Sequence, residues 1–360
     1  MKMFPIIVET NTRWKDNILQ IEDFVSMIWT DRYYTPGDFE LVVPATSRNL
    51  TAIKKGYLVG RVTERGLDEN AGIIEYIEKS IDEEGHRRML IKGRFLGAYF
   101  YRRVISNQTL LTTQNTLLNV VKFLCDTNAL DPYPVMDERK ITGILFDDES
   151  ATGPTINNLQ WTGQNLGESI SELCEANHVG WKVTRDGAVF YVSLYEGLDR
   201  SLSQSTNQWA VFSEEDGSLL TLTYSENDEN KVNSVRVAGE GEGADRRIYW
   251  EEQSPTASGY GRYEAWVDAR DIQSNNGEIS DAAYEAMLRN RAKSAFTDTE
   301  YVLEATAAFT NLKYKTDVDL GDLCTIKSRS LGIEVDARLV EVIESIDETG
   351  RYSAVPTFSI

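Results

Sequence analysis

Apolar and polar residues alternate along the first third of the chain, and this pattern predicts short β-strands. Residues 23–29 and 39–43 alternate in this way, with a Tyr-Thr-Pro-Gly turn between them. Further strand-like segments follow at 88–92 and 99–103, at the regular short spacing that is typical of a barrel or a sandwich. We therefore expect residues 1–110 to form a first β-barrel domain.

The pattern changes to helical spacing near Thr112. Residues 113–125 place apolar side chains three and four positions apart, and residues 166–177 do the same, so both segments are predicted to be helices. Two strand-like segments around an Asp-Gly turn predict a hairpin at 180–192. We expect residues 111–225 to form an inserted α+β domain.

Residues 226–360 return to a β pattern that one helix interrupts. The strongest helical pattern of the chain runs from 280 to 296, and Ser280 is its candidate N-cap. Strand-like segments resume at Tyr301 and continue to the C-terminus. We therefore expect residues 226–360 to form a second β-barrel domain, with an inserted helix near 280–297.

One stretch of the chain occurs twice. Residues 72–85 and 338–350 share a run of apolar and acidic residues that ends in Asp-x-x-Gly, and the segments before them match in the same order. Asp at the first position and Gly at the fourth fit a type I hairpin turn in each copy. The match requires one extra residue in the first copy, around Lys79, which predicts a β-bulge there.

This repeat predicts two related β regions, one at each end of the chain. Their separation far exceeds the period of solenoids and propellers, so it indicates a duplication with a large insert. Hairpins with such turns are common, and accidental similarity is the alternative explanation. The expected fold class is mainly β with an α+β insert, in which two related β-barrel domains flank the inserted region.

The chain has 360 residues, with 57 acidic and 37 basic side chains and a net charge of −20. Such a surface repels phosphate, which argues against a protein that grips nucleic acid. Cys125, Cys174 and Cys324 form no zinc or redox motif, so we expect reduced, buried thiols in a protein made in the cytoplasm. No apolar run is long enough for a membrane span or a signal peptide, so membrane insertion is not expected.

Candidate residues for chemistry are few. His86 is expected to be a solvated turn residue and His178 a residue at a helix C-terminus, rather than general bases. The carboxylates at 147–149 could pair as in a glycosidase, and residues 317–322 could bind calcium, but chance and a β-turn are the favoured explanations. The glycines of residues 239–243 lack the spacing of a dinucleotide site. The sequence therefore predicts no catalytic, cofactor-binding or metal-binding residue, and no cofactor.

Several stretches resemble the tail hub proteins of long-tailed phages. They are residues 33–41, 72–75, 91–96, 102–105 and 319–322. The chain resembles the N-terminal hub region of tail-associated lysins in siphophages and Gram-positive prophages. More distantly, it is similar to the baseplate hub of contractile tails and to the hub part of type VI secretion spikes. The resemblance covers nearly the whole chain.

The resemblance implies a structural hub of a phage or prophage tail tip or baseplate. Three chains would form a homotrimeric ring of six barrels that continues the tail tube and lets DNA or an effector pass without specific binding. Its implied partners are distal tail or tail tube proteins, with tape measure and receptor-binding proteins as further candidates. It would belong to the virion after synthesis in the host bacterial cytoplasm.

Many of these relatives continue into a lytic or receptor-binding region, whereas this sequence ends at Ile360. We therefore expect no enzyme activity from the chain. Two other function classes stay open. A glycan-acting, β-rich hydrolase would be favoured by clustered carboxylates that face a groove, and a carbohydrate-binding protein is the third possibility.

Overall fold

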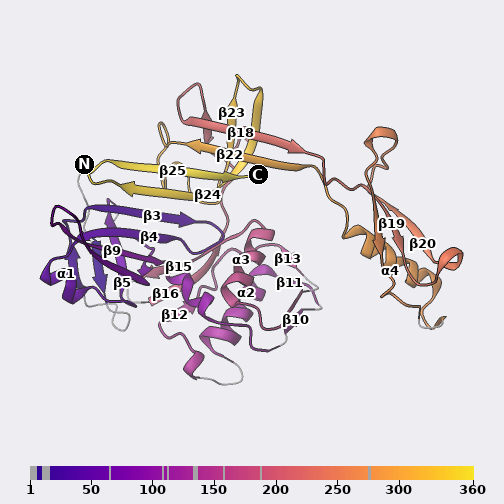
Figure 1. Ribbon diagram of the computed structural model, residues 1–360, viewed down its shortest axis with the longest axis horizontal. Coiled ribbons are helices and arrows are strands. Elements are labelled where there is room, and N and C mark those ends of the chain that lie inside the picture. Colours follow the sequence, from indigo (N-terminus) through magenta and orange to yellow (C-terminus); the bar gives the residue numbers. More distant parts are fainter. Residues whose placement is uncertain are drawn as a thin grey trace. The chain divides into compact units, whose positions relative to one another are not determined.

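The computed structural model in Figure 1 describes residues 6–9, 17–64, 66–107, 109–111, 113–132, 137–156, 159–186, 189–274 and 277–360. The chain forms two compact units. The first consists of Met1–Leu222 and Ala305–Ile360, and the second of Thr223–Glu304. The division into three domains at 110/111 and 225/226 stays a prediction.

The largest sheet of the first unit has eight strands and combines strands from both ends of the chain. In β4, Phe39, Leu41 and Val43 are buried while the residues between them are partly exposed, as the alternating pattern predicted. The sheet contains, in spatial order, β17 (Val211–Ser213), β23 (Leu323–Ser328), β24 (Ile333–Ile346), β3 (Ser26–Arg32), β4 (Asp38–Pro44), β9 (Arg87–Arg94) and β8 (Tyr76–Ile81), with β25 (Tyr352–Ser359) paired to β24.

Strand β24 joins the two terminal β regions. It runs antiparallel to β3, with Glu341 opposite Arg32 and Ile346 opposite Met27. The same residues of β24 also pair with β25. Figure 1 shows β25, β24, β3 and β4 side by side. The two regions therefore form one continuous sheet.

A second sheet packs against the first part of this large sheet. Its strands are β2 (Asn17–Ile21), β1 (Ile6–Glu9), β5 (Leu58–Thr63), β6 (Gly66–Leu67) and β7 (Gly72–Ile73). The helix α1 (Ser47–Ala52) precedes β5. A buried apolar cluster joins the two sheets, in which Ile6 and Leu19 of the second sheet belong with Trp29, Leu41 and Ile91 of the large one.

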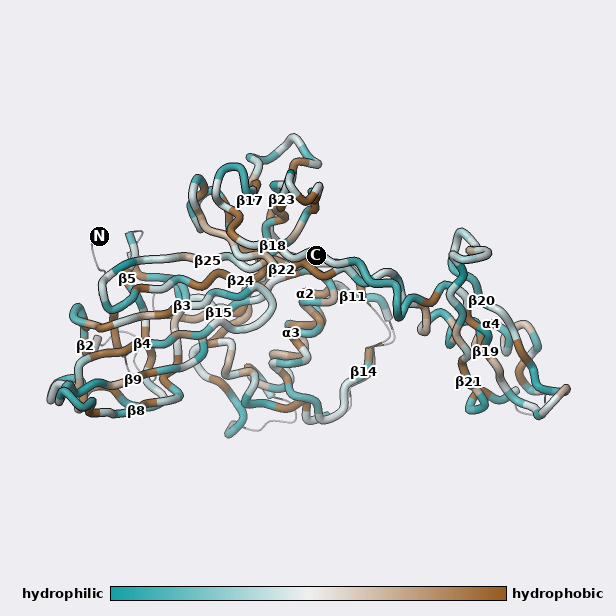
Figure 2. The backbone as a smooth tube through the Cα atoms, turned by 45° about the horizontal axis from the view of Figure 1, so that its top comes forward, coloured by the Kyte–Doolittle hydropathy of each residue, from teal (hydrophilic) through white to brown (hydrophobic). Residues whose placement is uncertain are grey.

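The α+β region of the first unit has its own core. Helices α2 (Leu117–Cys125) and α3 (Leu166–Ala176) confirm the two predicted helices, and both bury one face in an apolar cluster with residues of the hairpin at 180–195. Figure 2 shows hydrophobic and hydrophilic residues alternating around both helices. Strands β15 (Gly180–Asp186) and β16 (Val189–Tyr195) form the predicted hairpin, and β12 (Ile144–Phe146) pairs parallel to β16. Gly187, in its predicted turn, lies outside the described residues.

Short elements complete this region. They are a 3-10 helix at Leu96–Arg102, a π-helical extension of α2 at Asp126–Leu130, a 3-10 turn at Asp137–Arg139, and the strand pairs β10 (Thr109–Leu111) with β14 (Leu159–Trp161) and β11 (Asn115–Thr116) with β13 (Thr155–Ile156). The strand predicted at 99–103 is therefore wrong, because the aromatic residues there belong to the 3-10 helix, which buries Phe100 in the core of this region.

The second unit is a three-stranded sheet with one helix. Its strands are β20 (Ile248–Glu252), β19 (Ser234–Ala238) and β21 (Glu264–Asp268), with 3-10 turns at Gly243–Asp245 and Gly259–Gly261. The helix α4 (Asp281–Lys293) packs its buried residues against β19. Ser280 accepts a hydrogen bond from the N–H of Ala283 at 3.3 Å, so the predicted N-cap is confirmed. Strands β18 (Leu219–Asn227) and β22 (Glu300–Ala307) pair with each other and carry the chain into and out of this unit.

The chain is therefore mainly β, with an inserted α+β region, as predicted. The strand pairings of the described residues make up open sheets, and closure into barrels stays a prediction. All three cysteines are buried and free. No helix among the described residues is long and apolar enough to cross a membrane.

Candidate functional site

One group of side chains within the described residues brings three potential metal ligands together. Asp82, Glu84 and His86 lie in the turn between β8 and β9, and their ligand atoms are within 4.8 Å of one another. All three side chains are exposed, and Nδ1 of His86 lies 3.0 Å from the Asp82 carboxylate. The contact closes the hairpin turn, so the interpretation of His86 as a solvated turn residue is confirmed.

Residues 317–322 form a β-turn. The N–H of Asp322 donates to the carbonyl of Asp319 at 3.1 Å, and Gly321 has φ of 89°, which is the geometry of a type II turn. The Asp322 carboxylate is buried and pairs with Nε of Arg200 at 2.6 Å. The β-turn that the sequence favoured over a calcium loop is therefore confirmed.

The carboxylates at 147–149 make local contacts. Asp147 accepts hydrogen bonds from the N–H of Glu149 at 3.0 Å and from the hydroxyl of Ser193 at 3.2 Å. Asp148 forms an exposed ion pair with Lys122. These contacts shape the loop after β12.

His178 and residues 239–243 also have structural positions. His178 follows α3 directly, as predicted, and its carbonyl accepts a hydrogen bond from the Tyr33 hydroxyl at 3.1 Å. The loop 239–243 joins β19 to β20. Gly239 lies so close to α4 that an added Cβ would approach the Tyr284 hydroxyl to 2.1 Å. Close packing therefore explains this glycine without a bound dinucleotide.

The two copies of the repeated stretch end in the same turn. The carbonyl of Asp82 accepts from the N–H of Gly85 at 3.0 Å, and the carbonyl of Asp347 accepts from the N–H of Gly350 at 2.9 Å. Each aspartate side chain also accepts from the N–H groups two and four residues later. Both glycines have positive φ, 83° and 76°. The predicted Asp-x-x-Gly hairpin turns are confirmed in both copies.

The β-bulge predicted at Lys79 is wrong. Strands β8 and β9 pair without a register shift. The shift lies in the second copy, between Leu339 and Glu341, which leaves Val340 as the extra residue. The carbonyl of Val340 accepts instead from the N–H of Tyr33 at 2.9 Å. The bulge thus lies where β24 passes from its pairing with β23 to its pairing with β3.

The strands before the two hairpins have different neighbours. The sequence match aligns β5 with β23, yet β5 pairs with β1, β6 and β7, whereas β23 pairs with β17 and β24. The shared local structure is therefore clearest in the hairpins themselves.

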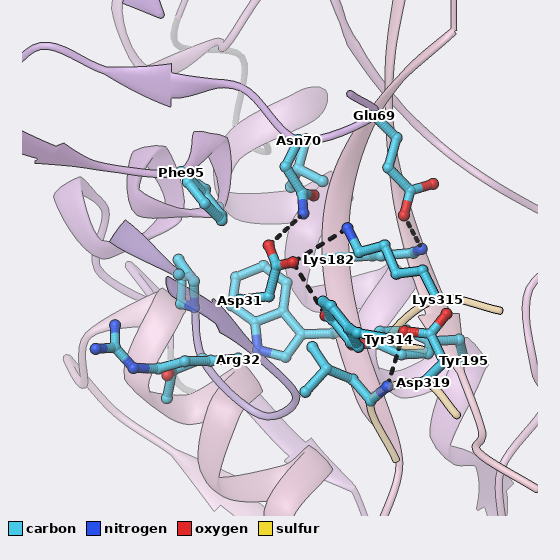
Figure 3. A pocket seen from close by; sticks show the side chains of 17 residues that line it. Asp31, Arg32, Glu69, Asn70, Phe95, Lys182, Tyr195, Tyr314, Lys315 and Asp319 are labelled. Atoms are coloured by element: carbon cyan, nitrogen blue, oxygen red, sulfur yellow. Dashed lines mark hydrogen bonds and ion pairs between the residues drawn. The ribbon is translucent and has the colours of Figure 1, made fainter. Parts of the chain in front are cut away.

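A buried ionic network lies at the junction of β3 and β24. Asp31 of β3 is 2% exposed, and Nζ of Lys315 lies 3.1 Å from its carboxylate. The Tyr314 hydroxyl donates to the same carboxylate at 3.0 Å, and the side-chain amide of Asn70 donates at 2.8 Å. Figure 3 shows these three side chains converging on Asp31. The network therefore connects residues from both ends of the chain.

Arg61 extends the network toward the second hairpin. Its Nε donates to Asp68 at 2.7 Å, and its other end pairs with Glu344 of β24. The guanidinium also lies 4.9 Å from the ring centre of Trp29, whose indole N–H has no hydrogen-bond partner among the described residues. Buried charges are costly unless they are paired. Glu344 can therefore pair with the buried Arg61 only while β24 lies beside β3.

The network holds its charges at neutral pH. Burial alone would raise the pKa of Asp31, but Lys315 and Arg61 lower it below its usual range. Burial would lower the pKa of Lys315, but Asp31 and Asp68 raise it above its usual value. A general acid or base needs a pKa near the working pH. These shifts move both groups away from that range, so the network is suited to structure and not to proton transfer.

A small pocket opens beside the network, as Figure 3 shows. Its wall includes the ion pair between Lys182 and Glu69, 2.9 Å long, and the Lys182 ammonium lies 4.9 Å from the ring centre of Tyr195. Burial raises the pKa of Tyr195 well above its usual value. Among the described residues, no serine, cysteine or histidine lines the pocket, so it contains no pair of such a nucleophile with a histidine base.

The large eight-stranded sheet, in which β24 joins the two terminal β regions, is called the joined sheet below. Its face that points away from Trp29 and Leu41 is polar. Arg32 contacts both Asp38 and Glu341 there, at 2.5 and 2.7 Å. By strand register, the charged residues that β3, β4, β8, β9 and residues 341–346 of β24 place on this face are Asp38, Glu40, Glu78, Glu341, Arg32, Arg88, Lys92 and Arg94. Acidic and basic side chains are equal in number, so this face is close to neutral although the chain is acidic.

Sequence reasoning missed the ionic network. Arg61 lies inside an otherwise apolar strand segment, and a charged residue in such a position is a signal of a buried ion pair. Lys315 lies in a polar stretch that gives no such signal. Its partner Asp31 is 284 positions earlier in the chain, so only the folded structure brings the two together.

Comparison with known proteins agrees with this architecture. A family model described as Siphovirus ReqiPepy6 Gp37-like protein matches residues 15–358. No curated protein matches the chain. The chain is similar to the tail protein from Neisseria meningitidis MC58, with 14% identity and a TM-score of 0.54, over 99% of this chain and 96% of that one.

Two prophage proteins are similar to the same extent. The 43 kDa tail protein of prophage MuSo2 from Shewanella oneidensis has 14% identity and a TM-score of 0.55, over 99% of this chain and 98% of that one. Prophage tail protein gp18 from Listeria monocytogenes EGD-e has 13% identity and a TM-score of 0.52, over 99% and 94%. At such identities the similarity shows the fold, which is that of phage tail proteins, and the resemblance read from the sequence is confirmed.

Proposed function

The chain belongs to the family of Siphovirus ReqiPepy6 Gp37-like proteins, and from that membership we propose that it is the structural hub of a phage or prophage tail tip or baseplate. Three chains form a ring that continues the tail tube. The observation that carries this proposal is the pairing of β24 with β3, which places both copies of the repeated hairpin in one sheet. Each chain contributes two similar segments, so three chains contribute six to a six-fold tube.

Strand β8 offers an edge to which the next chain can attach. Within the described residues it pairs with β9 alone, and Ile81 at its end is 67% exposed. An open strand edge pairs readily with another chain unless charge, proline or a bulge blocks it. In a closed ring of head-to-tail contacts, every such edge finds a partner. Ring formation therefore accounts for an exposed apolar side chain on an unpaired edge.

DNA or an effector passes through the channel of this ring without specific binding. A basic lining would hold DNA by counterion release, with a salt slope of about one unit for each phosphate contact. The net charge of −20 per chain disfavours such binding. The polar face of the joined sheet offers no excess of basic side chains either. Both observations support a channel whose wall carries at least as many carboxylates as basic groups.

The partners of this hub are distal tail or tail tube proteins, with tape measure and receptor-binding proteins next to them in the virion. Its synthesis takes place in the host bacterial cytoplasm. The role requires no catalysis. The alternative of a glycan-acting hydrolase gains no support, because the carboxylates at 147–149 hold a loop and an exposed ion pair.

Ring formation can be tested with the purified chain by light scattering and negative-stain electron microscopy. We expect a trimer with three-fold symmetry for the wild type and a monomer for Ile81→Lys, because an ammonium group on the edge opposes strand pairing. Leu331→Lys is the matched control, since Leu331 is 59% exposed in the turn between β23 and β24. A wild-type chain that stays monomeric, both alone and with isolated tail tubes, contradicts the proposal.

Hydrolase activity can be tested separately. The chain is incubated with purified cell wall and with a panel of glycans, and we expect no release of product. Turnover that disappears when a single carboxylate is replaced by its amide would show that the chain is an enzyme.

A further inference from the structure

The second unit carries a row of aromatic and basic side chains on one face of its sheet. Trp250 of β20, Arg236 of β19 and Trp266 of β21 lie directly opposite one another in three adjacent strands. All three are exposed, the tryptophans by 39% and 51%. Val235 and Val237 on the opposite face are buried in the cluster that includes α4. This Trp–Arg row (Trp250, Arg236, Trp266) is therefore on the face that the helix does not cover.

Arg236 lies at the centre of the row and has no carboxylate partner within the part of the chain that the structure describes. Its guanidinium lies 5.9 Å from the ring centre of Trp250 and 5.5 Å from that of Trp266. The other six arginines of residues 223–304 each form an ion pair with a carboxylate, whereas Arg236 forms none among the described residues. A guanidinium positioned between two rings presents its N–H donors as a planar fork, which matches the geometry of a carboxylate.

Ion pairs flank the row on both of its long sides. Arg262 bridges Glu252 and Glu264, which lie opposite Ser234, and Arg246 pairs with Asp268, which lies opposite Ala238. Each of these arginines also lies over the nearer tryptophan ring, at 5.1 and 5.5 Å. Tryptophan and arginine dominate the energetic centres of protein–protein interfaces, and charged residues occupy their rims. The face has this composition, with its one unpaired charge at the centre.

We propose that the Trp–Arg row is a docking surface for a protein segment that offers one carboxylate with an apolar side chain on either side. The carboxylate pairs with Arg236, and the apolar side chains cover Trp250 and Trp266. A highly acidic segment does not fit, because residues 223–304 contain 17 acidic and 9 basic residues and would repel it. A sugar ring fits less well, because each tryptophan ring already contacts two guanidinium groups.

The proposal can be tested by selecting short random peptides from a display library against the full chain. We expect the selected sequences to share one Asp or Glu flanked by apolar residues. For such a synthetic peptide, Arg236→Gln and Trp266→Ala should each weaken binding on the order of 10- to 100-fold, as for central interface residues. Replacing the acid of the peptide by its amide should have an effect of the same order.

Two matched variants control for general surface effects. Trp209→Ala removes a tryptophan of the first unit that is 55% exposed, and Arg291→Gln removes an arginine of α4 that pairs with Asp271. Both should leave peptide affinity unchanged. All four variants alter exposed or half-exposed side chains, and circular dichroism with thermal melting should show an intact fold.

Three results would overturn the proposal. The first is a selection without a shared acidic position, or binding that Arg236→Gln and Trp266→Ala do not change. The second is binding on a panel of neutral and acidic glycans that Trp266→Ala abolishes, which would assign the row to carbohydrate. The third is self-association, seen in light scattering, that Trp266→Ala abolishes and Ile81→Lys does not affect. That result would mean that the row binds a second copy of this chain.

Discussion

The hairpins β8–β9 and β24–β25 have the same turn and opposite surroundings. In both, an aspartate and a glycine three positions later make the same backbone and side-chain hydrogen bonds. Among the described residues, strand β8 ends the large sheet and pairs with β9 alone, whereas β24 has β25 on one side and β3 on the other. A turn is therefore fixed locally, while the burial of the strands that it connects depends on which neighbours the rest of the fold supplies.

Residues at the same distance from the two turn glycines, Gly85 and Gly350, differ in burial and in their partners. Lys79, six residues before Gly85 in β8, is exposed, whereas Glu344, six residues before Gly350 in β24, pairs with the buried Arg61. Ile81 is 67% exposed, whereas its equivalent Ile346 packs against the core between the two sheets. Corresponding positions of the two hairpins thus lie at an open edge in one hairpin and at an internal junction in the other.

Removing the buried cation of the junction should have the largest effect. Arg61→Ala leaves the buried Asp68 carboxylate without its closest cation, with Lys315 3.8 Å away, so we expect a loss of about 3–5 kcal/mol in the free energy of unfolding. Urea unfolding followed by circular dichroism measures it. The matched control is Arg88→Ala, because Arg88 pairs with Glu348 at the surface and such pairs contribute about 0–1 kcal/mol. Equal losses for both variants would contradict the proposed role of the network.

The second-largest effect is expected when Ile346 is replaced by alanine, and the same replacement of Ile81 should have a much smaller effect. Ile346→Ala removes atoms packed against the core, and we expect a loss of roughly 2 kcal/mol, at the low end for such substitutions because Ile346 is only partly buried. Ile81→Ala should change the stability of the monomer by less than about 0.5 kcal/mol, since its side chain is exposed. Thermal unfolding of the two variants compares them. A larger loss for Ile81→Ala would reverse the comparison.

The turn glycines should instead behave alike. Gly85 and Gly350 both have positive φ, and an added Cβ meets nothing within 4 Å in either turn. The cost of alanine is therefore backbone strain alone, about 1 kcal/mol in each case. Hydrogen exchange of the strand amides on either side of each turn measures the local opening. If the stability losses of Gly85→Ala and Gly350→Ala differ by more than about 1 kcal/mol, the two turns are not equivalent.

Titration of the turn carboxylates should give the smallest effect. Desolvation alone would raise the pKa of Asp82. Hydrogen bonds from His86 and Glu84 outweigh this effect, so the pKa lies below the usual 3.8. Hydrogen bonds from Thr349 and Arg351 lower the pKa of Asp347 in the same way. A lowered pKa in the folded state stabilises the fold above pH 3.8, and that contribution is lost as the pH falls through the folded value.

Carboxyl chemical shifts in an NMR titration measure both values. We expect both midpoints below 3.8. A midpoint at or above 3.8 for either residue would mean that the corresponding turn is not held by its aspartate in solution.

A large part of the local structure could be predicted from sequence. The helices α2, α3 and α4, the Ser280 cap and both Asp-x-x-Gly turns follow from residues within a few positions of one another. The bulge was predicted in the wrong copy. A sequence match shows that one residue is extra, but the strand that accommodates it is decided by pairing partners that the match does not contain.

The sequence by itself determined the helices α2, α3 and α4, the alternating strands and the hairpin turns, because caps, turns and alternation depend on neighbours along the chain. It did not determine the 3-10 helix at Leu96–Arg102, where a strand was predicted at 99–103. Only the tertiary structure decided that β24 lies beside β3, which brings Arg32 into contact with Glu341, 309 positions away. The same pairing makes Glu344 a partner of Arg61, 283 positions away, while β8 lies at one end of the same sheet. Such contacts between distant residues leave no periodic signal, since each depends on two segments whose approach is set by the packing of the whole unit.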